Sequence, residues 1–280
     1  MTNPLTAHPR RYVLVAIAAA LAIVAGIFGP GALAALGFGN AKDRIAASPP
    51  PALFAEAQVS ATQTANDAQT TQAEAMFAEW TKVHGTTRDD QAFITWLEGR
   101  FPGPPSNLAS EIRVNQDWFK QRTKSGVAAA TWLEAFGKKD IWKLYAHDQA
   151  ELMKPASGDA LKTDEKDLLS MTKQVADDLG AKFGSNAPYV VQPSLRPDHT
   201  VTPGQKCPCS YPSRHAAAAA GSRVFLASRD AHRDAEYSWM QSQIDFSRIY
   251  MAGHYPTDVT AGTLLGDVIG EYFVATRSVT

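Results

Sequence analysis

The chain has few cysteines, little net charge and few segments in which apolar and polar residues alternate. Its 280 residues include two cysteines, Cys207 and Cys209. A structural zinc site needs further ligands at characteristic spacing, and because the chain offers no such set we expect no bound metal. In an exported protein an even number of cysteines favours a disulfide, and a pair of free thiols is the alternative.

The charges of the chain are almost balanced. It has 27 Lys and Arg against 28 Asp and Glu, with a formal net charge of -1. Proteins that bind nucleic acid usually carry a basic stripe or patch, so this balance predicts no nucleic-acid partner. Any binding of anions must therefore come from a local cluster of cations.

One long apolar run lies at the N-terminus. Arg10 and Arg11 precede an uncharged segment, residues 12–41, that is rich in Ala, Val, Leu and Ile. A basic start before an apolar stretch is typical of an export signal, and Gly39 and Ala41 offer a cleavage site. A bilayer takes about 20 apolar residues to cross, so a retained single membrane anchor is the alternative. Because the arginines should stay inside the cell, both alternatives predict a periplasmic or extracellular location, free or tethered to the inner membrane.

Helical periodicity dominates the rest of the chain, and the expected fold class is all-α. Residues 1–41 form the export segment, and residues 42–85 form a tether with a peripheral helix or a partly mobile segment. The main helical domain spans residues 86–280, enough for one sizeable core. Its helices are predicted at residues 87–100 with Thr87 as the cap, then at 106–121, 128–153, 163–183, 213–231, 234–251 and 257–276, with an irregular loop at 184–211.

Three short motifs follow one another in the C-terminal third. In the last, Ser247-Arg248 is separated by five residues from His254, and His254 by three from Asp258. Singly, such residues fit helix caps or surface ion pairs, so their function depends on the ordered combination. Two histidines, a carboxylate and arginines are the groups needed to transfer a phosphoryl group without a metal. The two upstream motifs are Arg196-Pro197 and Pro212-Ser213-Arg214-His215.

In this order the motifs resemble the signature of the type 2 phosphatidic acid phosphatase superfamily, which runs Lys-x6-Arg-Pro, Pro-Ser-Gly-His and Ser-Arg-x5-His-x3-Asp. The third part matches at every defined position, and the resemblance covers residues 182–273. The chain is closest in kind to the bacterial class A non-specific acid phosphatases. It departs from the signature where Arg214 replaces the glycine and Tyr189 the lysine. Lys182 is the favoured substitute for that lysine, and Lys206 is the other candidate.

The resemblance implies a compact helical bundle of the acid phosphatase/vanadium haloperoxidase type. It also implies an exported phosphatase that hydrolyses small phosphate monoesters without a metal or other cofactor. His254 would attack phosphorus and form a phosphohistidine, Asp258 would accept its other ring N–H, and His215 would act as general acid and base. The phosphate would be held by Arg196, Arg248, Ser213, Arg214 and Lys182.

Three other functions fit the same motifs. A lipid phosphatase at the membrane surface is the nearest, although integral lipid phosphatases of this superfamily have several hydrophobic spans and this chain shows one. Vanadate mimics phosphate, so a vanadium-dependent haloperoxidase is another alternative. Because Arg214 replaces a glycine, a catalytically degenerate phosphate-binding scaffold is the alternative outside enzymes. The motifs do not determine the natural substrate or the oligomeric state.

Overall fold

The computed structural model of the protein describes residues 40–197 and 209–277. The chain divides into two compact units, Met1–Pro49 and Pro50–Thr280. In the first unit the described part contains a short helix, α3 (Ala41–Ala47), which is capped by the side chain of Asn40. Residues 1–39, which make up nearly all of the predicted export segment, lie outside the described residues. Within the described ranges, no helix is both long and apolar enough to span a membrane.

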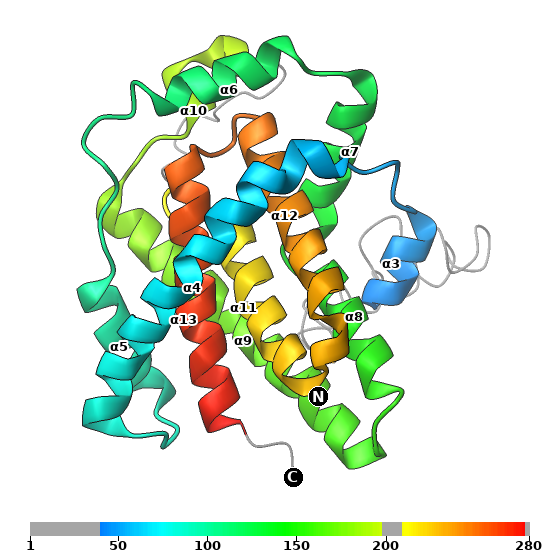
Figure 1. The fold of residues 1–280 in the computed structure, drawn as a ribbon, viewed down its shortest axis with the longest axis vertical. Helices are drawn as coiled ribbons and strands as arrows, with labels where there is room; N and C mark the ends of the chain where they lie inside the picture. The colour runs from blue at the N-terminus through cyan, green and yellow to red at the C-terminus, as the bar shows by residue number, and fades with distance from the viewer. Residues whose placement is uncertain (1–39, 198–208, 278–280) are drawn as a thin grey trace, which may run out of the picture. The chain divides into compact units, whose positions relative to one another are not determined.

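The second unit is built from helices throughout its described residues, which confirms the all-α class. Its centre is formed by α11 (Arg214–Arg229), α12 (Asp234–Tyr250) and α13 (Pro256–Thr276) (Figure 1). Helices α11 and α13 pack closely because small residues face each other. A Cβ atom on Gly266 would lie 2.3 Å from the carbonyl oxygen of Ala217, so only glycine fits there.

Three further helices pack beside this centre: α7 (Lys124–Phe136), α8 (Asp140–Ala150) and α9 (Pro155–Phe183). The single helix predicted at residues 128–153 is wrong, since α7 ends before Gly137 and α8 starts at Asp140. The indole N–H of Trp142 donates to the carbonyl of Gly137 at 2.9 Å, and this bond links α8 to the end of α7. Helix α9 begins earlier than predicted, because a proline fits the first turn of a helix.

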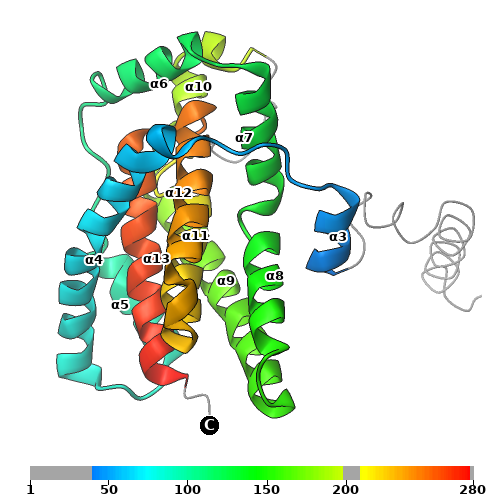
Figure 2. The same cartoon turned by 45° about the vertical axis from the view of Figure 1, so that its right-hand side comes forward.

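Helix α4 (Glu56–His84) lies along α12 and α13 and belongs to the same compact unit (Figures 1 and 2). Buried polar contacts hold it in place. The side-chain amide of Asn66 donates to Asp245 at 2.9 Å, and its oxygen accepts from Thr263 at 3.1 Å. Of the two alternatives predicted for residues 42–85, a helix or a partly mobile segment, the structure contains the helix.

One end of the unit is covered by α6 (Glu111–Lys120) and α10 (Pro188–Val191), which lie near the turn between α12 and α13 (Figures 1 and 2). Helix α6 begins later than predicted, and α10 replaces part of the irregular loop expected at 184–211. Helix α5 (Asp90–Arg100) is capped by Asp89 and not by Thr87. The remaining elements are the 3-10 helices η2 (Pro193–Leu195) and η3 (Ala231–Arg233).

Candidate active site

His254 lies in the turn that joins α12 to α13. The carbonyl of Arg248 accepts hydrogen bonds from the N–H groups of Gly253, at 3.0 Å, and His254, at 3.3 Å. Ala252 takes a φ of 54°, in the left-handed region that L-residues other than glycine seldom adopt. The turn is therefore held in one conformation by its own backbone bonds, at a cost in local strain of about 1 kcal/mol.

Helix α6 fixes this turn from outside. Asn115 is fully buried, and its side-chain amide donates to the carbonyls of Ile249, at 2.9 Å, and His254, at 3.1 Å. One helical turn earlier, the carboxylate of Glu111 accepts from the N–H of Thr257 at 3.0 Å and from its hydroxyl at 2.7 Å. Two side chains on one face of α6 thus hold both sides of the His254 turn.

The imidazole of His254 has a defined tautomer. Its Nδ1 lies 2.7 Å from the carbonyl oxygen of Ser210, and because a carbonyl can only accept, Nδ1 carries the hydrogen. The predicted bond to Asp258 is not formed, since Oδ2 of Asp258 lies 3.9 Å from Nδ1. This oxygen instead accepts from the N–H of Tyr255 at 2.8 Å, at the start of α13. Neutral His254 therefore has its lone pair on Nε2.

Burial and a nearby positive charge keep His254 neutral. Burial, and after it the positive charge of Arg248, lowers the pKa of His254 to about 4. Burial raises the pKa of Asp258 to about 7, against the N–H of Tyr255, which lowers it. The His254 ring is thus an unprotonated nucleophile at any pH above its lowered pKa.

His215 lies in the first turn of α11. Its Nε2 is 3.0 Å from the backbone carbonyl of Glu134 in α7, so Nε2 carries a hydrogen and Nδ1 is the atom that can gain or lose a proton. Burial, followed by the charge of Arg248, holds the pKa of His215 well below its usual range. The two histidines therefore present different ring nitrogens for chemistry.

Arg196 and Arg248 converge on one carboxylate. Each guanidinium has a nitrogen 3.4 Å from Oε2 of Glu134. Arg248 is nearly buried and also donates to the carbonyl of Ala130 at 3.0 Å and to Oγ of Ser247 at 3.0 Å. Glu134 could not be predicted from the sequence, because no motif includes it. The two predicted arginines are brought together, with an anion of the protein itself between them.

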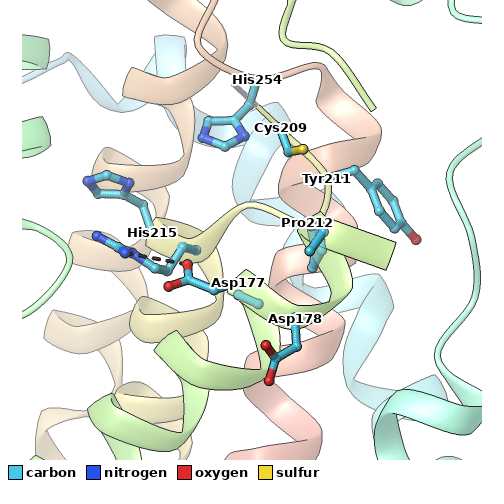
Figure 3. A pocket seen from close by; sticks show the side chains of 11 residues that line it. Asp177, Asp178, Cys209, Tyr211, Pro212, His215 and His254 are labelled. Atoms are coloured by element: carbon cyan, nitrogen blue, oxygen red, sulfur yellow. Dashed lines mark hydrogen bonds and ion pairs between the residues drawn. The ribbon is translucent and has the colours of Figure 1, made fainter. Parts of the chain in front are cut away.

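A pocket of about 520 Å³ opens beside the two histidines (Figure 3). It lies between α9 and the segment that leads into α11. Cys209 lines it and is disulfide-bonded, whereas Cys207, its predicted partner, lies outside the described residues. The lining side chains that can take part in chemistry are Asp177, Asp178, Tyr211, Arg214, His215 and His254.

The phosphate-binding lysine predicted from the sequence does not join the site. The ammonium group of Lys182 donates to the backbone carbonyl of Glu98 at 2.7 Å, and it does not line the pocket. Lys206 lies outside the described residues. Tyr189 has its ring 5.6 Å from the guanidinium carbon of Arg196 and so supports that arginine.

Lys138, which the sequence analysis did not single out, is a described lysine whose positive charge acts on His215. It follows α7 directly, and its pKa is lowered by burial and then by the charges of Arg214 and Lys139, while Glu134 acts in the opposite direction. Because interactions between charges weaken with distance, these effects on its pKa indicate that Lys138 lies near Arg214 and Arg248. The break between α7 and α8 places it there.

Ser213 and Arg214 open helix α11. Ser213 is fully buried and acts as the N-cap, its Oγ accepting from the N–H of Ala216 at 3.4 Å. Its own N–H donates to the backbone carbonyl of Asp258 at 2.8 Å, which ties α11 to the start of α13. Arg214 reaches Asp177 of α9 at 3.5 Å and lines the pocket. The replacement of glycine thus adds a guanidinium group to the pocket wall.

A scan of the chain against models of protein families found no match, and a search of curated proteins found none. The resemblance to the type 2 phosphatidic acid phosphatase superfamily therefore depends on the three motifs.

Proposed function

We propose that the protein is a metal-independent phosphatase that hydrolyses phosphate monoesters through a phosphohistidine. The observation that carries this proposal is the pairing of a neutral His254, with its Nε2 lone pair available, and His215 in the wall of one pocket beside two converging arginines. A nucleophile, a second imidazole for proton transfer and paired guanidinium groups are the minimum set for this reaction.

The reaction would proceed in two steps. Nε2 of His254 attacks phosphorus as the bond from phosphorus to the ester oxygen breaks, and Nδ1 of protonated His215 gives its proton to the leaving oxygen. An alcohol leaves and a phosphohistidine remains. Neutral His215 then takes a proton from water, whose oxygen attacks phosphorus, and phosphate departs from His254.

The charge distribution suits this sequence of events. His254 stays unprotonated down to its pKa of about 4, as the first step requires. His215 must be protonated in that step, and its pKa is low, but a bound phosphate would raise it by placing negative charge nearby. Because the protonated fraction of His215 grows as the pH falls, the first step is expected to be favoured under acidic conditions.

The location outside the cytoplasm is part of the proposal and follows from the N-terminal sequence. The apolar segment after Arg10-Arg11 supports export, with or without a retained anchor. An exported enzyme would meet small, soluble phosphate esters.

Hydrolysis of p-nitrophenyl phosphate by the purified protein, with and without EDTA, tests the proposal. We expect the rate to be unchanged by EDTA and the His254→Ala variant to lose nearly all activity, because it lacks the ring nitrogen that forms the phosphohistidine in the proposed first step. The matched control is His232→Ala, an exposed histidine that does not line the pocket. Full activity of His254→Ala, or complete loss with EDTA, would overturn the mechanism.

A further inference from the structure

A second pocket, of about 350 Å³, lies next to the candidate active site. It is formed by α8, α9, α11 and the break between α7 and α8. Five of its lining residues are lysines and a sixth is an arginine, while no acidic residue lines it. These cations are Lys138, Lys139, Lys143, Lys166, Lys173 and Arg214.

The acidic groups around this pocket do not balance its charge. Asp177 is shared by two of the cations, at 2.7 Å from Lys173 and 3.5 Å from Arg214. Glu165, whose charge would act on Lys143, is fully buried, and burial raises its pKa to about 8, so it is mostly protonated at neutral pH. Glu134, whose charge acts on Lys138, is already shared by Arg196 and Arg248. Because six cations line the pocket, it keeps an excess of positive charge, unlike the chain as a whole.

The two pockets meet at Arg214, which lines both. Lys138 forms a second connection, since it lines the lysine pocket and its charge is felt by His215 and is itself affected by Arg248. An anion in the lysine pocket would thus lie close to a phosphate at the two histidines. One molecule with two phosphate groups could reach both places.

We propose that the lysine pocket binds a second phosphate group of the substrate, so that the preferred substrates are small bisphosphorylated molecules. This inference rests on the proposed phosphatase activity for the first phosphate. Ammonium groups act as flexible point charges that suit a phosphate held without strict geometry, while the guanidinium of Arg214 can contact both phosphates. The proposal also gives a role to Arg214, the residue at the position of the glycine in the family signature.

A comparison of fructose 6-phosphate with fructose 1,6-bisphosphate tests the pocket. We expect the wild-type protein to favour the bisphosphate in kcat/KM by about tenfold, as one or two charge-assisted contacts would give. The double variant Lys139→Gln/Lys166→Gln changes two exposed lysines of the pocket that lie outside the catalytic groups. It should lose this preference and keep its rate on fructose 6-phosphate within about twofold.

The matched control is the double variant Lys82→Gln/Lys162→Gln, which removes the same charge from exposed positions outside the pocket. It should keep the preference for the bisphosphate. Equal losses on both substrates in the pocket variant would show a general effect of charge and overturn the proposal. The absence of any preference in the wild type would overturn it as well.

Calorimetric titration with fructose 1,6-bisphosphate separates this proposal from the proposed activity. Carried out on the His254→Ala protein, it measures binding without turnover. Weaker binding when Lys139→Gln/Lys166→Gln is added, by about fivefold or more, supports the pocket even if the wild type hydrolyses nothing. Unchanged binding would overturn the pocket and leave the phosphatase proposal standing.

Discussion

The carboxylate of Glu134 occupies the position between two arginines where an anion of the substrate would be expected. Its Oε2 is within 3.4 Å of both Arg196 and Arg248, and its backbone carbonyl separately holds His215. A phosphate bound by the same two guanidinium groups would be repelled by this carboxylate and must displace it. The side chain is 36% exposed and so has room to move away.

Replacing Glu134 by glutamine should therefore strengthen phosphate binding. The amide removes the negative charge but keeps the backbone bond to His215. We expect inorganic phosphate to inhibit the Glu134→Gln variant about fivefold more strongly, a gain of roughly 1 kcal/mol, and the KM for p-nitrophenyl phosphate to fall in parallel. Steady-state inhibition kinetics measure both quantities.

Glu79→Gln is the matched control, since Glu79 is an exposed glutamate in α4 that pairs with Arg100 at 3.4 Å. It should leave both constants unchanged. If phosphate instead binds more weakly to Glu134→Gln, the carboxylate holds the arginines in their binding positions and does not compete with phosphate.

At the scale of elements, α6 controls where the nucleophile lies. Asn115 satisfies two backbone carbonyls of the His254 turn, and Glu111 caps α13 on its other side. Without these bonds, the strained residue Ala252 would have freedom to relax and move the imidazole. Helix α6 is thus a positioning element, although it contributes no residue that lines the pocket.

The Asn115→Ala variant should lose turnover more than binding. It leaves two carbonyls without their buried donor, which costs roughly 1–3 kcal/mol of stability, and a shift of the ring by about 1 Å can cost on the order of a hundredfold in rate. We expect kcat for p-nitrophenyl phosphate to fall at least tenfold with KM changed less than threefold. Thermal unfolding of the same samples checks that the variant is folded at the assay temperature.

Asp117→Asn, which alters an exposed carboxylate of α6 that pairs with Lys120, provides the control and should change neither constant. A rise in KM with constant kcat in Asn115→Ala would contradict the positioning role, because it would mean that the amide helps to bind substrate.

The break between α7 and α8 explains one limit of sequence reasoning. Helical periodicity continues through residues 128–153, so one long helix was the natural prediction. The helix is interrupted at Gly137, which follows the last residue of α7 and whose carbonyl accepts from Trp142, and the apolar period alone does not show this break. This interruption places Lys138 among the arginines, so the error in the helix and the missed lysine have one cause.

Across the whole molecule, helical periodicity predicted the all-α class, and the motifs predicted most of the groups that gather at the site. His215 and His254 line one pocket, and Arg196 and Arg248 converge, as their order along the chain indicated. Asn115 and Glu134 could not be found in this way. Their contacts with the histidines join residues 139 and 81 positions apart, and they depend on how α6 and α7 pack.

The stability of the fold depends on buried acids as well as on apolar packing. Glu165 of α9 is fully buried and accepts a hydrogen bond from Ser222 of α11 at 2.6 Å. Burial raises its pKa from an ordinary value of 4.5 to about 8. A carboxyl group with a raised pKa is protonated in the folded protein and ionised after unfolding. Its contribution is fully present below the unfolded pKa and is lost as the pH rises through the folded pKa.

The Glu165→Gln variant should remove this pH dependence, because an amide of similar shape does not titrate. At about pH 3, well below the ordinary pKa of the group, the acid is protonated in both states, so the unfolding temperatures of variant and wild type differ only by the local cost of the amide. As the pH rises to about 8, the wild type alone loses stability. The difference in unfolding temperature should therefore move in favour of the variant by roughly 3 °C or more, since 1 kcal/mol shifts Tm by about 2–4 °C in a unit of this size. Calorimetry at several pH values measures this change.

Glu56→Gln, at an exposed glutamate of α4, should keep a constant difference from the wild type. A constant difference for Glu165→Gln too would mean that the carboxyl group already ionises in the folded protein within its ordinary range.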